Sequence, residues 1–176
     1  WGLRQLDVPE TLPEALRYVE TLTKADKVGD VAAWYDHQAS QLNQFLGRRK
    51  YAPADGAMRK FLDVRQGAMA EARYSAVWAL GMIHEGEPVA DLTAKFEERI
   101  RAAKAPIPTE DPTLARMAAV SLGRMKAEKH LEVLRQYYEK KPTFDQVNNA
   151  CGWAIERITG EKVPAAGEFT VVRRDW

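Results

Sequence analysis

One pattern of small and apolar residues occurs three times along the chain. Its six positions follow the spacing i, i+3, i+4, i+7, i+8 and i+11, so they lie on one face of a helix. The copies consist of Ala72, Ser75, Ala76, Ala79, Leu80 and Ile83; of Leu114, Met117, Ala118, Ser121, Leu122 and Met125; and of Val147, Ala150, Cys151, Ala154, Ile155 and Ile158. Successive copies begin 42 and 33 residues apart, and such periods are typical of stacked helical repeats.

Each of the first two copies is followed by a short turn and a second amphipathic helix. The apolar stripes of these second helices are Val89, Leu92, Phe96 and Ile100, and then Leu131, Leu134 and Tyr138. The segment 101–112 contains three prolines and accounts for the longer first spacing, so we expect a loop there or a lengthened helix plus loop. Asp111 followed by Pro112 predicts the start of the next helix.

Two further helices are predicted before the repeats. Apolar residues at helical spacing run from Leu12 to Leu22 and from Val31 to Leu46, and they predict an antiparallel helical hairpin over residues 11–50. Thr11 and Glu14 have the form of a capping box. Gly47 is predicted to end the second helix as a left-handed cap. From residue 51 to 67 the pattern weakens, and only a short helical turn is expected.

The last repeat contains only its first helix. Thr143 and Gln146 form a second possible capping box, and Thr159 with Gly160 should end the helix. Beyond this point apolar and polar residues alternate over 168–173, which predicts an extended tail over 161–176.

These patterns predict an all-α fold in one helical domain over residues 1–176. The domain would be a short α-solenoid of antiparallel helix pairs over 70–160, with the hairpin before it and the tail after it. Because the chain begins with Trp1 rather than Met, we expect it to be a processed chain or a piece of a larger protein.

Composition changes this picture little. The hydrophobic fraction is 45%, which predicts a folded chain, and no apolar run is long enough to span a membrane. The formal net charge is +1, so nothing global favours a nucleic acid partner. The single cysteine excludes an internal disulfide.

The candidate reactive residues are few. His37, His84 and His130 lack the spacing of a metal site, and the latter two are expected at exposed or capping positions near turns. Cys151 stands where other copies have alanine, which favours a buried packing residue over a nucleophile. Glu97, Glu98 and Asp145 are carboxylates without a catalytic pattern.

Two other features have structural interpretations. Trp78 and Trp153 occupy the same position in their copies, so packing between helices is favoured over a ligand site. The basic cluster 48–50 suits the end of a helix.

The repeated helix resembles a known family. The segments 72–83 and 115–125 are similar to the first helix of HEAT-like repeats, especially the short variety of phycobilin lyases and bacterial scaffold proteins, and the resemblance covers about residues 70–160. It departs at Glu156, where other copies have Gly81 and Gly123, and at Asn148, where the first copy has Arg73. The resemblance implies an α-solenoid that binds macromolecules, and it transfers no catalytic residue.

The function predicted from this resemblance is a non-catalytic scaffold or protein-interaction module. Its partner would be another protein or other domains of the same parent chain, without cofactor or metal. The resemblance places the binding face on the second helices, where the candidate residues are Asp91, Lys95, Glu98, Arg135 and Tyr137. The alternatives are a domain of an enzyme such as a tetrapyrrole lyase and, less favoured, a nucleic-acid-binding solenoid.

Overall fold

The computed structural model describes residues 8–24, 30–63, 69–139 and 145–163, and all regular structure in these ranges is helical. The α-helices are α2 (Leu12–Lys24), α3 (Asp30–Arg48), α4 (Asp55–Leu62), α5 (Ala70–Ile83), α6 (Ala90–Ala103), α7 (Pro112–Arg124), α8 (Leu131–Tyr137) and α9 (Gln146–Thr159). Short 3-10 turns occur at Pro9–Thr11, Ala52–Ala54 and Glu128–His130. The expectation of an all-α chain is therefore confirmed for the described residues.

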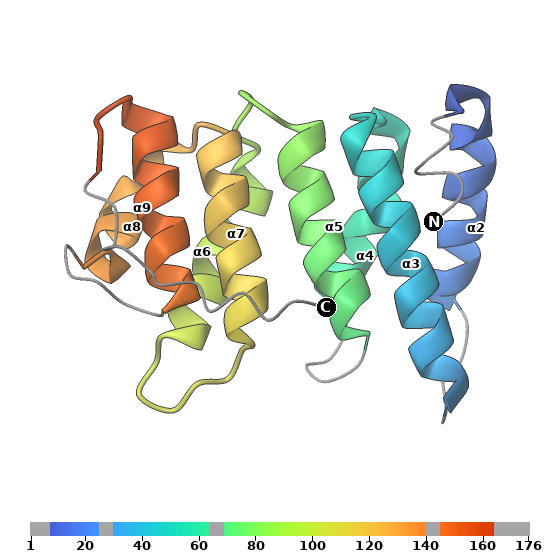
Figure 1. The fold of residues 1–176 in the computed structure, drawn as a ribbon, viewed down its shortest axis with the longest axis horizontal. Helices are drawn as coiled ribbons and strands as arrows, with labels where there is room; N and C mark the ends of the chain where they lie inside the picture. Colours follow the sequence, from blue (N-terminus) through green and yellow to red (C-terminus); the bar gives the residue numbers. More distant parts are fainter. Residues whose placement is uncertain (1–7, 25–29, 64–68, 140–144, 164–176) are drawn as a thin grey trace, which may run out of the picture.

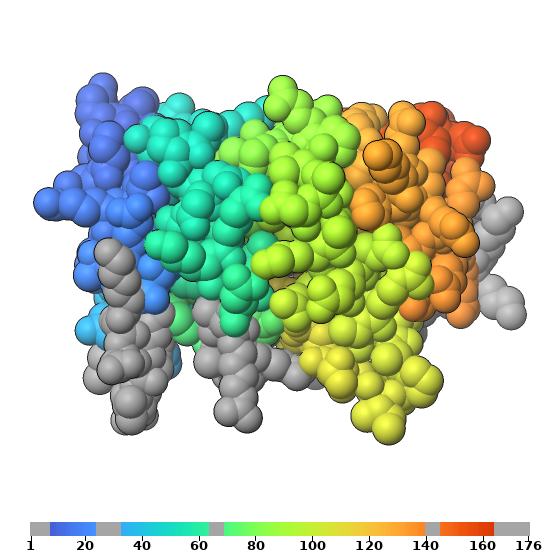
Figure 2. All heavy atoms as spheres, turned by 180° about the vertical axis from the view of Figure 1, so that it is seen from behind, coloured from blue at the N-terminus to red at the C-terminus, as the bar shows by residue number. Residues whose placement is uncertain are grey.

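The helices lie in two layers. Helices α3, α5, α7 and α9 stand side by side as the first layer, each in contact with the next (Figure 1). Helices α4, α6 and α8 form the second layer and pack against α5, α7 and α9 respectively; they occupy the opposite face (Figure 2). Helix α2 contacts α3 and α4 at one end of the row. The predicted tail, from residue 164 onwards, lies outside the described residues.

The repeated pattern forms the buried face of the first layer. Of its 18 positions only Ile83 and Met117 are half-buried, and all the others are buried. The small residues at the third and fourth positions allow neighbouring helices to approach closely. No described helix is both long enough and apolar enough to cross a membrane.

Glycines define the closest contacts of the first layer. A Cβ atom on Gly81 would lie 2.8 Å from Cα of Ser121, and one on Gly123 would lie 2.8 Å from Cα of Ala154. Both distances are shorter than any side chain tolerates, so glycine is required by the neighbouring backbone. Glu156 replaces this glycine in α9, where it is exposed and no further first-layer helix follows among the described residues.

Helices α3 and α4 extend the two layers by a further pair of helices, which the sequence pattern does not predict. A Cβ atom on Gly47 of α3 would lie 2.7 Å from Cα of Ala79, the same contact one step earlier in the row. The prediction that Gly47 caps a helix is wrong, because it lies inside α3 and the left-handed residue is Lys50, with φ 47°. The segment predicted to be weakly helical holds α4, whose buried residues are Ala57, Met58, Phe61 and Leu62.

The proline-containing segment contributes to the core through one carboxylate. Glu110 lies in the loop between α6 and α7 with only 3% exposure. Nη2 of Arg73 donates to its Oε2 at 2.7 Å, and Nη1 of Arg99 donates to the same oxygen at 3.3 Å. Arg73 is 2% exposed. Arg73 stands where the other two copies have Ala115 and Asn148, and only the first copy is followed by the longer segment 101–112. The arginine found only in the first copy therefore has its counter-charge in that segment.

Helix ends agree with the sequence in part. Oδ1 of Asp111 accepts from the N–H of Thr113 at 2.6 Å, and Gly160 ends α9 with φ 79°, both as predicted. Helix α9 is capped by Asp145, whose Oδ1 accepts from the N–H of Val147 at 2.8 Å, while Thr143 lies outside the described residues. The Thr11 hydroxyl donates to the Val8 carbonyl at 2.7 Å, so its bond closes a 3-10 turn and does not form the predicted box.

The glycine contacts predict a clear effect of one added methyl group. Gly81→Ala should lower the free energy of unfolding by about 1 to 3 kcal/mol, because the methyl overlaps the backbone of α7. Urea denaturation of the purified protein measures this. Gly56→Ala in α4 is the matched control, since nothing lies within 4 Å of its Cβ position, and it should be neutral or slightly stabilising. Equal effects of the two substitutions would contradict the close approach.

The buried ion pair gives a second prediction. Glu110→Gln should lower the free energy of unfolding by about 3 to 5 kcal/mol, because it leaves the buried guanidinium of Arg73 without a counter-charge. Glu98, an exposed carboxylate of α6, provides the control, and Glu98→Gln should leave the unfolding midpoint within experimental error. An unchanged unfolding midpoint of Glu110→Gln would show that this ion pair does not stabilise the folded protein.

Candidate interaction groove

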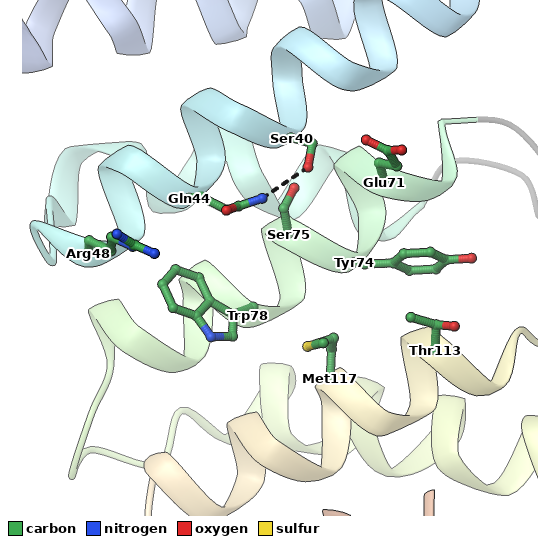
Figure 3. Close-up of a pocket in the computed structure, with 9 residues that line it drawn as sticks. All are labelled: Ser40, Gln44, Arg48, Glu71, Tyr74, Ser75, Trp78, Thr113 and Met117. Atoms are coloured by element: carbon green, nitrogen blue, oxygen red, sulfur yellow. Dashed lines mark hydrogen bonds between the residues drawn. The ribbon is translucent and has the colours of Figure 1, made fainter. Parts of the chain in front are cut away.

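An open groove of about 470 Å³ runs along the outer side of the first layer. Its residues come from three neighbouring helices at helical spacing, so α5 forms the floor and α3 and α7 form the walls (Figure 3). They are Ser40, Gln44 and Arg48 from α3, Glu71, Tyr74, Ser75 and Trp78 from α5, and Thr113 and Met117 from α7. The groove thus exists only because three helices of the first layer stand side by side.

Trp78 occupies one end of the groove, and Gly47 makes room for it. Cζ3 of the indole would lie 3.0 Å from a Cβ atom on Gly47, so the ring covers the glycine of the preceding helix. Trp153 covers Gly123 in the same way, with the same 3.0 Å contact. The packing role predicted for both tryptophans is therefore present, and each ring also keeps an exposed part, which is 42% of Trp153.

The Trp78 end of the groove is basic. The guanidinium carbon of Arg124 lies 5.1 Å from the centre of the Trp78 ring, within cation–π distance. Burial lowers the pKa of Arg124 from its usual value, and its Nη1 has no hydrogen-bond partner in the structure described. Arg48 points towards the same indole (Figure 3), and no ion pair of Arg48 with a carboxylate occurs among the described residues. Glu85 attracts Arg124 but pairs with Lys50 at 2.7 Å and with Arg157 at 3.0 Å, so the cations outnumber it.

The opposite end is acidic. Glu71 lines it and pairs with Nδ1 of His37 at 2.9 Å. Asp36 of α3 accepts from the N–H of Ala72 at 2.7 Å and so caps α5 from the neighbouring helix. Burial and the carboxylate of Asp111 raise the pKa of Tyr74 to about 12, so its hydroxyl stays protonated at physiological pH. The groove is therefore polarised along α5.

The residues predicted as a binding face lie elsewhere, all on helices α6 and α8 of the second layer. Asp91 pairs with Arg59, Lys95 donates to Asp63 at 2.8 Å, and Arg135 lies 3.6 Å from Glu161. Glu98 is exposed, and the carbonyl of the half-buried Tyr137 accepts from Asn148 at 3.4 Å. None of them lines the groove. Their role as a binding face stays a prediction, and four of them already bind other parts of the chain, Tyr137 through its backbone carbonyl.

The candidate reactive residues are embedded in the fold. Cys151 is fully buried, and burial raises its pKa to about 12, which is the opposite of an activated thiolate. His84 and His130, predicted to be exposed or capping, are instead partly buried and bind carboxylates. Nε2 of His84 lies 2.7 Å from Asp55, and Nδ1 of His130 lies 2.6 Å from Glu97. In the described ranges, no three His, Cys, Asp or Glu side chains are grouped to hold a metal ion.

Comparison of the chain with models of protein families, with curated proteins and with solved structures gave no match. The groove must therefore be interpreted from its own residues. Sequence reasoning missed it because its lining residues come from three helices, one of which was not assigned to the repeat. A usable signal was present: the pair Leu-Gly at 46–47 recurs at 80–81 and 122–123, each time near the end of a first-layer helix.

The environment of Cys151 predicts its reactivity. At pH 8 the folded protein should react with a thiol reagent such as DTNB only as fast as the helix row opens, because the thiol is buried and protonated. The same protein in 6 M guanidinium should react completely within minutes. Fast stoichiometric labelling of the folded protein would contradict the structural role of this cysteine.

Proposed function

We propose that this chain is a non-catalytic protein-interaction module built as a short α-solenoid of HEAT-like helix pairs. The partner is another protein or another domain of the same parent chain. The regular first layer, with one glycine contact between each pair of neighbours, supports the solenoid arrangement, and α2 covers its first end. The additional helix pair α3 and α4 supports a longer stack than the sequence pattern alone.

The observation that carries the proposal is the composition of the groove. Trp78, Tyr74 and Met117 supply aromatic and adaptable apolar surface, and Arg48 lies beside them. Tryptophan, tyrosine and arginine are the residues that most often anchor protein interfaces. On the second layer, by contrast, Asp91 and Lys95 pair with the neighbouring helix, which leaves less free hydrogen-bonding capacity for a partner.

The two alternative functions receive less support. A lyase-like reaction would favour Cys151 or His84 in a pocket, whereas the thiol is buried and neutral and neither residue lines the groove. A nucleic-acid-binding solenoid would favour a continuous basic stripe, whereas the groove combines a basic end with an acidic one.

The interaction proposal predicts that capture of partners depends on the groove. The immobilised protein should retain a defined set of proteins from an extract of its own source, and Trp78→Ala should weaken their binding by at least about thirtyfold, the size of a strong hot spot. Quantitative mass spectrometry of the retained proteins measures this. Circular dichroism of the variant checks that it is folded.

The matched control is Trp34→Ala, which removes a tryptophan of α3 that is 72% exposed and does not line the groove. This variant should retain the same proteins as the unmodified chain. If Trp78→Ala retains them equally well, the groove is not the binding site. If Arg135→Ala loses them instead, the interaction face is the second layer.

A further inference from the structure

Arginines of the described chain differ in whether a carboxylate partner is present. Most pair with a carboxylate, namely Arg17, Arg59, Arg73, Arg99, Arg101, Arg135 and Arg157. Among the described residues no ion pair with a carboxylate is formed by Arg48, Arg116 or Arg124, although Glu85 attracts Arg124 from a longer distance. Arg116 is exposed on α7, whereas Arg48 and Arg124 lie beside Trp78. A buried charged donor without a partner is costly, as at Nη1 of Arg124. This end of the groove therefore favours an incoming carboxylate.

Next to its basic end, the groove favours a large apolar side chain. Trp78 of the floor and Met117 of the wall lie on either side of it (Figure 3). An indole offers a wide rigid surface, and a methionine adapts its shape to whatever packs on it. Ser40 and Gln44 of the opposite wall are joined by a 3.3 Å hydrogen bond and give that wall a polar surface suited to peptide backbone.

The far end disfavours a second negative charge. Glu71 lies there with Asp36, which caps α5, and with Asp111 near the hydroxyl of Tyr74. A basic side chain is attracted to this end, and a polyphosphate chain is repelled by it. The charges of the groove therefore set a direction for its ligand.

The length of the floor limits the size of the ligand. From Glu71 to Trp78 an α-helix rises by about 10 Å. An extended chain covers this distance with about three to four residues. The groove volume of about 470 Å³ suits a segment of that size and not a folded domain.

We propose that the groove binds an extended segment of about four residues in a partner protein. An Asp or Glu of this segment faces Arg48, a large apolar side chain packs on Trp78 and Met117, and a Lys or Arg lies towards Glu71. This inference rests on the interaction function proposed above and specifies its ligand. The required order of acidic, apolar and basic residues distinguishes this groove from a surface that binds proteins non-specifically.

The test is an array of short synthetic peptides with four varied positions between Gly-Ser flanks. The protein is compared with Arg48→Glu and with Arg135→Glu, a control that makes the same charge change on the second layer. The unmodified chain and Arg135→Glu should retain peptides of acidic, apolar, basic order. Arg48→Glu should retain them at least about tenfold less and prefer a basic residue where an acidic one was preferred.

Solution titrations of the best peptide by fluorescence anisotropy complete the test. The affinity should fall when salt is raised from about 50 to about 300 mM, because part of the attraction is electrostatic. Reversal of the peptide's charges should weaken binding at least about tenfold, as should Met117→Asp, which leaves the charges of Arg48 and Glu71 in place. A single-stranded oligonucleotide should bind more weakly than the peptide.

Several results would overturn the inference. These are an array without preference for charge order, a preference that Arg48→Glu leaves unchanged, or an oligonucleotide that binds as tightly as the best peptide. If captured partners depend on Trp78 while the array shows no charge order, the interaction function stands and the peptide chemistry is wrong. If neither capture nor the array depends on groove residues, both proposals fail.

Discussion

The close approach of neighbouring first-layer helices is the constraint on which the rest of this structure depends. Gly47, Gly81 and Gly123 each meet the backbone of the next helix at a distance that excludes a side chain. Polar bonds reinforce the same contacts, since the Ser121 hydroxyl donates to the Val77 carbonyl at 2.8 Å. Because the contact is repeated, each helix fixes the position of the next one along its axis. The second layer can therefore pack on a regular surface.

Much of this architecture could be predicted from the sequence, because burial follows from helical spacing. The small positions Ala76, Ala118 and Cys151 are all fully buried, as their shared place in the pattern indicates. Helix α3 was not assigned to the repeated helices because Phe45 stands where the others have Ala79, Ser121 or Ala154, so the small-residue pattern fails there. Helix α3 shares only the Leu-Gly pair with α5 and α7. The glycine of this pair is kept because the backbone of the neighbouring helix leaves no room for a side chain.

The groove and its charges were less predictable, because they depend on which helices become neighbours. Nothing local to Arg73 indicates that Glu110, in a loop 37 residues away, neutralises it. Likewise, Asp91 and Lys95 look like free surface charges on an isolated helix, and only the position of α4 shows their partners. Helical spacing predicts which side of a helix is polar. Which of its polar groups remain free to bind a partner depends on the helices that pack beside it.

The shared register of the first layer also has a consequence at long range. Helices α3, α5, α7 and α9 run in the same direction (Figure 1), since Asp36 of α3 caps the start of α5 and Gly47 of α3 contacts α5 near its end. The C-terminal ends of these helices therefore lie along one edge of the layer. Arg48 and Arg124 follow the repeated glycine directly and lie at one edge, whereas Glu71 and Asp36 lie towards the other. Although the net charge of the chain is only +1, the charges along the groove are separated, which would orient a charged segment as it approaches and make its association rate sensitive to ionic strength.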